Sequence, residues 1–480
     1  MNVLSSGVRS VLHKTHKIPC LKAHFQCFCH STREAGSHSQ ASYISENFAS
    51  CLENCPDFLS LRKLHACIFA YGLGNSIFVG SKLLNCYAKF GLLAESRWVF
   101  DRIINDKLSL WNSILVGYFR SGYFDEVLRR YSSLRERKIG LDSSGITFGL
   151  KSCVELGSLE FGRGIHVDAF KFGLSRDRFV GSSLIGLYAK HGDIEDASKA
   201  FDEISERDVV VYTSMITGYA QVGDHCAYEA FVVARDMQKE QLDPNRVTLV
   251  SLVQAAAQLE ALEEGRLVHG YAIRRGIGCS DEVFETSLMD MYIKCGATRM
   301  ASCIFGKMNA RTVMSWNVVI AGHLQMGQPL EALDLFYLMV QDNTVPDLIT
   351  LANGILSCAS LEYLRGGKSI HSYTIRAGVQ LDLVATTALI DMYSKCNDLI
   401  QARELFDRME ERDVISFNVM MAGFLQNGFA YLAIDTYCKM AGAGIRPNPG
   451  TILIILSASS DLKDIRLGRW DPWTYIKTWV

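Results

Sequence analysis

Four histidines recur at nearly equal intervals and are the first residues to consider for chemistry. His65, His166, His269 and His371 each follow an aliphatic residue, at spacings of 101, 103 and 102 residues. Imidazole binds metals and transfers protons, so a cluster of histidines would indicate a metal or catalytic centre. Three helical repeats separate consecutive histidines, however, and packed helices lie roughly 8–10 Å apart, so the histidines cannot share a ligand. We therefore expect buried residues on second helices, each making a local hydrogen bond.

A second group of metal-binding residue types lies near the N-terminus. His24, Cys27, Cys29 and His30 stand close together, but their spacing fits no standard zinc site. The surrounding residues are rich in serine and basic side chains, and no acidic residue precedes Glu34. This composition is typical of an organellar transit peptide. We expect residues 1–40 to be a disordered transit peptide for the mitochondrion, with a plastid address or a plain disordered tail as alternatives.

Composition indicates a folded chain without a cofactor. Of the 480 residues, 49% are hydrophobic and 21% are charged, and the net charge is −2. No apolar run reaches the roughly 20 residues of a membrane helix, so no membrane partner is expected. The 15 cysteines are scattered, often on helical apolar positions such as Cys153, Cys295 and Cys396, which favours reduced, buried thiols. Phosphate-binding glycine loops and nucleophile elbows are absent from the sequence, so we expect no small-molecule substrate.

Internal repetition decides the fold class, because a fixed period marks a stacked array. Three frames alternate along the chain. The histidine-bearing frame, of 35 or 36 residues, occupies 42–76, 143–177, 246–281 and 348–382, with a partial copy at 449–469. A 31-residue frame occupies 77–107, 178–208, 282–312 and 383–413. A third frame, of 35 residues in most copies, occupies 108–142, 209–245, 313–347 and 414–448, and residues 470–480 form an aberrant tail.

Each frame has the periodicity of a helical hairpin. In the frame at 108, the first apolar stripe is Trp111, Ile114, Leu115 and Tyr118, and the second is Phe124, Val127, Leu128 and Tyr131. Gly122 permits the turn between them, as Gly192 does in the frame at 178. Such stripes are buried only when hairpins stack on one another. The sequence therefore predicts an all-α protein, a right-handed α-solenoid of stacked helical hairpins whose first helices line a concave face.

These motifs resemble the pentatricopeptide repeat (PPR) family, in its land-plant subclass with alternating P, L and S repeats. WNSILVGYFRSG at Trp111, SSLIGLYAKHGDIEDASKAFDEISERD at Ser182, SLMDMYIKCG at Ser287 and ALIDMYSKCNDLIQARELFDRMEERDV at Ala388 carry the resemblance over about residues 42–469. The histidine-bearing frames are the L repeats, the 31-residue frames the S repeats and the third frames the P repeats. Tetratricopeptide repeats keep a single 34-residue length and fit this alternation poorly.

The resemblance implies binding of single-stranded RNA, one base per repeat. The family reads bases with the fifth residue of the first helix and the last residue of the repeat. The P-repeat pairs are Asn112 with Asp142, Thr213 with Asn245, Asn317 with Asp347, and Asn418 with Asn448, which favour U, A, U, and C or U. The S-repeat pairs Ser182 with Asp208 and Thr387 with Asp413 favour G. Ser81 with Lys107 and Thr286 with Thr312 match no usual pair, and L repeats, with Thr147, Val250 and Ala352, should read weakly. The expected site is N-U-N-G-A-N-N-U-N-G-Y.

Each of these roles has a simpler structural alternative. Polar residues near a helix start often only cap the helix. Apolar residues at the second position, which would sandwich bases, could belong to the core; they are Phe78, Phe179, Val210, Val283, Met314, Val384 and Ile415, with Ser109 the exception. Basic residues at position 13, which would contact phosphates, also suit a helix C-terminus; they are Lys89, Arg120, Lys190, Lys294 and Lys395.

Many relatives in this family end in a zinc deaminase domain, whose H-x-E and P-C-x-x-C motifs do not occur here. We therefore expect no enzymatic activity, and a role in organellar RNA editing with a deaminase in trans or another PPR partner, in splicing or in RNA stabilisation. Pro472 stands where the last L frame should carry its histidine, which suggests a shortened gene model or splice form. A protein-interaction scaffold and a truncated product without activity remain the alternatives.

Overall fold

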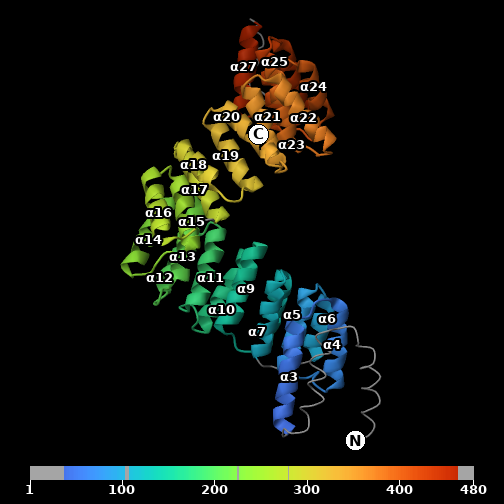
Figure 1. Ribbon diagram of the computed structural model, residues 1–480, viewed down its shortest axis with the longest axis vertical. Helices are drawn as coiled ribbons and strands as arrows, with labels where there is room; N and C mark the ends of the chain where they lie inside the picture. The colour runs from blue at the N-terminus through green and yellow to red at the C-terminus, as the bar shows by residue number, and fades with distance from the viewer. Residues whose placement is uncertain (1–36, 103–107, 224–225, 279–280, 463–480) are drawn as a thin grey trace. The chain divides into compact units, whose positions relative to one another are not determined.

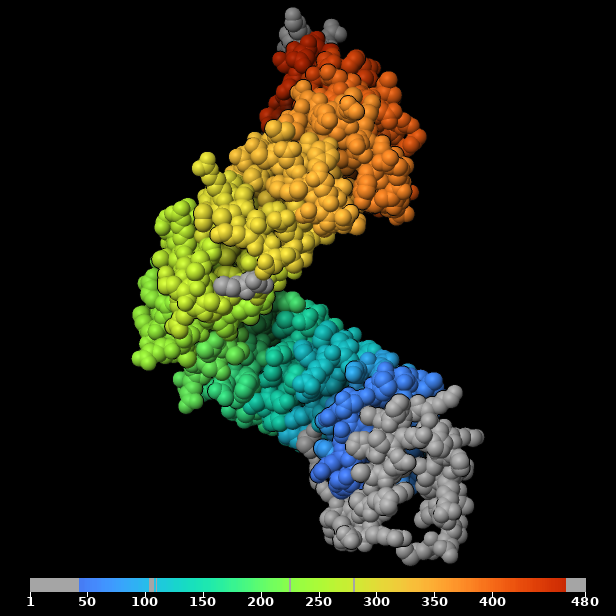
Figure 2. Space-filling view, viewed as in Figure 1, coloured from blue at the N-terminus to red at the C-terminus, as the bar shows by residue number. Residues whose placement is uncertain are grey.

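The computed structural model describes residues 37–102, 108–223, 226–278 and 281–462, and in these ranges it consists of helices without strands (Figure 1). The chain divides into two compact units, Met1–Pro244 and Asn245–Val480, which are described separately. Each repeat from 42–76 to 414–448 forms a hairpin of two helices, and the described part of the last, partial repeat is a single helix. Within each unit the repeats follow one another in chain order, as the colours of Figure 2 show. The predicted all-α solenoid of stacked helical hairpins is confirmed.

The first unit contains the helices α3 to α14. Its first helices are α3 (Ser37–Glu53), α5 (Ile77–Lys89), α7 (Leu108–Arg120), α9 (Ser143–Leu156), α11 (Arg178–Lys190) and α13 (Val209–Val222). Its second helices are α4 (Phe58–Ala70), α6 (Leu93–Arg102), α8 (Phe124–Glu136), α10 (Leu159–Lys171), α12 (Ile194–Glu203) and α14 (Ala227–Lys239). Each first helix packs against the next first helix, so these helices form one continuous layer. Helix α3 includes residues 37–40, which the sequence assigned to the leader; residues 1–36 lie outside the described residues.

The second unit repeats this arrangement. Its first helices are α15 (Arg246–Gln258), α17 (Glu282–Lys294), α19 (Val313–Gln325), α21 (Leu348–Ser360), α23 (Leu383–Lys395), α25 (Val414–Gln426) and α27 (Pro449–Asp461). Its second helices are α16 (Leu262–Arg275), α18 (Thr298–Lys307), α20 (Pro329–Gln341), α22 (Leu364–Arg376), α24 (Leu399–Arg408) and α26 (Ala430–Gly442). Pro472 and the rest of the aberrant tail lie outside the described residues.

The difference in length between repeats lies in the second helix. In the S repeats this helix has 10 residues, as in α12, whereas the P-repeat helix α8 has 13. The predicted first stripe of α7 is buried, since Trp111, Ile114, Leu115 and Tyr118 are at most 2% exposed. In the second stripe, Val127 and Tyr131 are fully buried while Phe124 and Leu128 are half-buried. The turn glycines Gly122 and Gly192 have φ values of 78° and 79°, which side chains disfavour.

An aromatic contact joins each S repeat to the following P repeat. A phenylalanine on the short second helix meets the fourth residue of the next first helix edge-on. The pairs are Phe100–Trp111, Phe201–Tyr212, Phe305–Trp316 and Phe406–Phe417, with ring centroids 4.8, 5.4, 4.6 and 5.1 Å apart. Edge-to-face pairs at this distance add roughly 0.5–1.5 kcal/mol beyond their buried area. These contacts fix the register in which successive first helices are presented.

The cysteine prediction requires a correction. Cys153 is fully buried, and burial raises the pKa of its thiol to about 12. Cys295 and Cys396 are only half-buried, because each is the C-cap of a first helix and not part of its apolar stripe. Among the helices that the structure describes, none combines the length and hydropathy needed to cross a membrane.

Candidate nucleic-acid interface

The P-repeat pairs of the second unit are held together by hydrogen bonds. Asn317 Nδ2 donates to both carboxylate oxygens of Asp347 at 3.0 Å, and Thr350 Oγ1 donates to Asn317 Oδ1 at 2.6 Å. Asp347 also accepts from the backbone amide of Thr350 at 2.8 Å. Burial alone would raise the pKa of Asp347, but the hydrogen bonds from Thr350 and Asn317 outweigh it and hold this pKa below its usual value. The exposed pair therefore presents an ionised carboxylate, which can only accept hydrogen bonds.

Asn418 and Asn448 form a neutral version of the same pair. Asn418 Nδ2 donates to Asn448 Oδ1 at 3.0 Å, and Thr451 Oγ1 donates to Asn418 Oδ1 at 2.7 Å. Asn448 Oδ1 accepts from the Thr451 amide at 2.9 Å. Because Oδ1 is held by these donors, the Asn448 amide group is free to offer its N–H groups at the surface. The two pairs thus share one geometry and differ in whether the last residue accepts or donates.

The equivalent pair of the first unit is less complete. Asn112 Nδ2 donates to Asp142 Oδ2 at 2.6 Å, as predicted for a cooperating pair. Asn112 Oδ1, however, is buried without a hydrogen-bond partner among the described residues. Gly145 stands where the later repeats carry Thr350 and Thr451, so the hydroxyl that would satisfy this oxygen is missing. The pair of the second P repeat is divided between the compact units: Thr213 is buried in the first, and Asn245 caps α15 in the second.

In the S repeats the two predicted residues do not bond to each other. Ser182 Oγ donates to the carbonyl of Phe179 at 3.0 Å, and Thr387 Oγ1 donates to that of Leu383 at 2.7 Å. A hydroxyl near a helix start commonly bonds back to its own helix in this way. Asp208 and Asp413 instead bind the backbone amides that begin the next helix. Ser81 behaves like Ser182, and its partner Lys107 lies outside the described residues.

The last residue caps the next first helix in each repeat whose end the structure describes, apart from the question whether it also meets a base. In each case its side chain accepts a hydrogen bond from an amide in the first turn of the next first helix. These residues are Ser76, Asp142, Asp177, Asp208, Asn245, Asp281, Thr312, Asp347, Asp382, Asp413 and Asn448. Capping leaves a carboxylate with spare lone pairs, so the same side chain can cap and still meet a ligand. The fifth residue lies beyond the capping positions, and capping does not explain its recurrent polarity.

The apolar residues at the second position are not core residues. The side chains of Phe179, Val210, Met314, Val384 and Ile415 are exposed by 54, 54, 65, 65 and 60%, and Phe78 and Val283 by 49 and 54%. An exposed apolar side chain at the same position of successive repeats forms a row that water solvates poorly. Sequence reasoning missed Val247 and Ile349, which are 50 and 61% exposed at the second position of two L repeats. Their position in the frame was the signal. The side chain of Ser109 is not described.

The basic residues at position 13 end their helices, about 16 Å along the axis from the second position. Lys89, Arg120, Lys190, Lys294 and Lys395 are the last residues of α5, α7, α11, α17 and α23. Lys294 and Lys395 are paired with Asp290 and Asp391 at 2.9 and 2.8 Å. Among the described residues, Lys89, Arg120 and Lys190 form no ion pair. Both interpretations of this row, phosphate binding and stabilisation of the helix dipole, fit these positions.

The four histidines join neighbouring repeats. Nδ1 of His65, His166, His269 and His371 lies 2.6, 2.8, 2.8 and 2.8 Å from the hydroxyl of Tyr87, Tyr188, Tyr292 and Tyr393. The predicted hydrogen bond is confirmed, but the histidines are half-buried, and the partner lies on the first helix of the next repeat. Burial lowers the pKa of all four imidazoles. No group of three metal-binding side chains occurs within the described ranges.

Comparison with known proteins agrees with this geometry. The PPR repeat profile matches residues 81–108, 109–139, 182–209, 314–344, 384–414 and 415–445, and the pentatricopeptide repeat domain profile matches 205–257. A mitochondrial pentatricopeptide repeat-containing protein of Arabidopsis thaliana is 36% identical over 412 residues, which are 85% of this chain and 73% of the relative. A second mitochondrial Arabidopsis thaliana protein is 35% identical over 83% of this chain and 66% of its own length, and a chloroplastic one is 30% identical over 90% and 54%.

The chain therefore spans between about half and three quarters of these relatives. The crystal structure of the maize pentatricopeptide repeat protein PPR10 superimposes with a TM-score of 0.57 at 16% identity, covering 93% of this chain and 69% of that one, which is a likeness of fold. Repeat profiles, sequence identity and fold lead to one conclusion: the chain belongs to the pentatricopeptide repeat family.

Proposed function

We propose that the protein binds single-stranded RNA sequence-specifically, with one base at each P and S repeat. The P-repeat pairs would meet the Watson–Crick edges, and the exposed second-position side chains of adjacent repeats would stack on the base faces. Stacking contributes roughly 1–3 kcal/mol per base and is blind to sequence. Specificity then comes from hydrogen bonds at the base edge, because a wrong base leaves polar groups unsatisfied.

The observation that carries this proposal is the combination of two rows on the first helices. Polar pairs such as Asn317 with Asp347 are preorganised by hydrogen bonds before any ligand arrives. Next to them, large apolar side chains such as Met314 and Val384 are 65% exposed. A protein core would bury such residues, and a solvated surface would not repeat them. Planar ligands with a hydrogen-bonding edge satisfy both rows at once.

The relatives named above are mitochondrial or chloroplastic proteins, which supports a role in organellar RNA metabolism. We place this protein in the mitochondrion, with the chloroplast as the alternative. No catalytic group is assigned to the chain. It would act by occupying a chosen RNA segment, which suits editing with a deaminase or another PPR protein in trans, splicing, or protection of RNA ends.

The test is the affinity of the full-length protein for an 11-nucleotide RNA with the expected site, compared with a scrambled RNA of the same composition. We expect clearly tighter binding of the expected sequence. Replacing both Met314 and Val384 with Ser should weaken the binding of both RNAs, because stacking does not depend on the base sequence. Lys190→Gln should flatten the salt dependence without changing the preference. Equal affinity for the expected and scrambled RNAs would refute recognition and favour a protein-interaction scaffold.

A further inference from the structure

In three repeats the first residue of the first helix contacts the last residue of the same repeat. Arg178 Nε lies 3.9 Å from Asp208 Oδ2, Arg246 forms a bidentate ion pair with Asp281, and Thr312 Oγ1 donates to Glu282 Oε1 at 2.5 Å. In most other repeats the first residue is apolar and can make no such contact, as with Val313 and Leu383. A charged first residue therefore changes what the last residue can offer to a ligand.

The repeat 282–312 is the one where this contact changes the interface most. Its fifth residue, Thr286, has a buried hydroxyl without a partner among the described residues, so it presents no group to a base. The Thr312 hydroxyl donates its only hydrogen to Glu282, and its oxygen accepts from the Ser315 amide at 3.5 Å. Glu282 itself is exposed. The polar edge of this repeat thus consists of the Glu282 carboxylate and one oxygen lone pair of Thr312, all of them acceptors.

We propose that Glu282 is a specificity-determining residue and that the repeat 282–312 selects guanine. This inference rests on the proposed function, and it assigns the seventh base of the expected site, which the two-residue rule leaves open. The site then becomes N-U-N-G-A-N-G-U-N-G-Y.

The chemistry of the base edges leads to guanine. Guanine carries two adjacent donors, N1–H and the N2 amino group, which a carboxylate accepts in a bidentate geometry. Adenine and cytosine each place a ring acceptor beside their amino group, and that acceptor would face the carboxylate. Uracil offers one N–H between two carbonyl oxygens, which the negative charge repels. Hydrogen bonds to a charged group are the strong ones, so an acceptor-only edge discriminates well.

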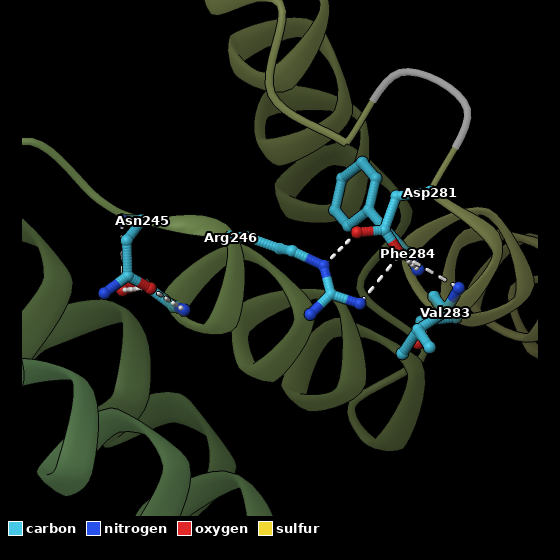
Figure 3. A network of polar contacts seen from close by, with 7 residues as sticks. Asn245, Arg246, Asp281, Val283 and Phe284 are labelled. Carbon is cyan, nitrogen blue, oxygen red and sulfur yellow. Dashed lines mark hydrogen bonds and ion pairs between the residues drawn. The ribbon is translucent and has the colours of Figure 1, made fainter. Parts of the chain in front are cut away.

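The preceding L repeat shows the opposite effect of a charged first residue. Figure 3 shows the Arg246 guanidinium directed at the Asp281 carboxylate, which also accepts from the amides of Val283 and Phe284 at 3.0 and 3.3 Å. Three of these donors bind Oδ1 and one binds Oδ2, and the guanidinium offsets the negative charge of the carboxylate. With Val250 at the fifth position, the acceptor that remains in this repeat is a lone pair of Asp281 Oδ2 beside a cation, so we expect it to bind a base more weakly than Glu282 does. A charged first residue thus weakens the acceptor of one repeat and adds an acceptor to the next.

The experiment measures dissociation constants of the full-length protein for four RNAs that differ only at the seventh base. Wild type should prefer G over A by about tenfold, which corresponds to about 1.4 kcal/mol. Glu282→Gln keeps an oxygen for the Thr312 hydroxyl but turns the other acceptor into a donor, which matches adenine N1. We expect this variant to lose the preference for G and to bind the A-containing RNA at least as tightly.

Glu264→Gln is the matched control, because it removes an exposed carboxylate of the same compact unit on a second helix. It should raise the affinity for all four RNAs equally through net charge. A preference for G that survives Glu282→Gln, or no preference in wild type, overturns the inference. The eighth base, assigned to Asn317 and Asp347, distinguishes a failure of the role of Glu282 from a failure of the proposed RNA recognition. Selection of U there with no selection at the seventh base removes only the role of Glu282, whereas selection at neither base removes the proposed function.

Discussion

Changing Asp347 to Asn gives the most informative single-atom test of base recognition. The substitution replaces one carboxylate oxygen with an amide nitrogen in the pair Asn317–Asp347. The protein already contains the product of this change, because Asn418 and Asn448 form the corresponding neutral pair with the same Thr contacts. Asn and Asp cap helices about equally well, so the start of α21 should be unaffected. The variant therefore changes recognition without changing the fold.

The expected magnitude follows from the two geometries. In the variant, Oδ1 stays bound to the Thr350 amide, as Asn448 Oδ1 is bound to that of Thr451 at 2.9 Å. An N–H group then points where the second carboxylate oxygen stood, which in the wild type accepts from Asn317 and keeps a lone pair for a base. Uracil loses a hydrogen bond from its N3–H to a charged acceptor, worth about 1.5–3 kcal/mol, while cytosine N3 gains a donor. The preference for U over C at the eighth base should fall by at least about tenfold, since each 1.4 kcal/mol is one decade.

The assay is a competition between RNAs with U or C at the eighth base for wild type, for Asp347→Asn and for the reciprocal variant Asn448→Asp. The reciprocal change should raise the preference for U over C at the eleventh base. Circular dichroism and urea unfolding should be the same for all three proteins. Unchanged U-to-C ratios in both variants, with folding intact, would refute the claim that these pairs meet individual bases.

Two further predictions concern stability. Gly145→Thr should raise the free energy of unfolding by about 1–2 kcal/mol, because its hydroxyl would satisfy the buried Asn112 oxygen and a glycine would leave the helix. A Cβ there would lie 3.4 Å from Asn112 Oδ1, so the side chain fits. The urea midpoint should be higher for Gly145→Thr than for the control Gly145→Ala. Equal gains in stability would contradict the role of the hydroxyl. Burial lowers the pKa of His371 below its usual value of 6.5, so the unfolded chain takes up the proton first as the pH falls. The folded state should therefore lose stability as the pH falls below about 6.5. The thermal midpoint should fall less between pH 7.5 and pH 5.5 in His371→Gln than in wild type; an equal fall would show that the titration of His371 does not cause the loss.

The sequence predicts the helices well because their signal is local. The stripe containing Trp111 and Leu115 repeats at helical spacing and is buried, and the turn at Gly122 has the expected positive φ. The pairing of Asn317 with Asp347 is also recovered, since the shared length of 35 residues brings both positions together in three of the four P repeats. An alignment that is correct for one of these P repeats is therefore correct for the other two.

Contacts that depend on side-chain reach could not be predicted in this way. The hydrogen bond from Thr312 to Glu282 joins residues 30 positions apart, and the residues adjacent to each in the sequence do not predict it. The S-repeat hydroxyls illustrate the same limit, since Ser182 bonds to its own helix and not to Asp208. The tyrosine partners of the histidines were not predicted either, although the histidines and these tyrosines recur with the same period of three repeats.

The capping role of the last residue in each repeat has an evolutionary consequence. A substitution that alters base choice at this position keeps a strong cap only within the small set Asp, Asn, Ser and Thr, because an alanine in their place costs the neighbouring helix about 0.5–2 kcal/mol. Adaptation to a new transcript at this position is thereby favoured among these four residues, whose codons differ by one or two nucleotides. Divergence toward other ligands must proceed through the fifth and first positions, where the backbone imposes no such restriction.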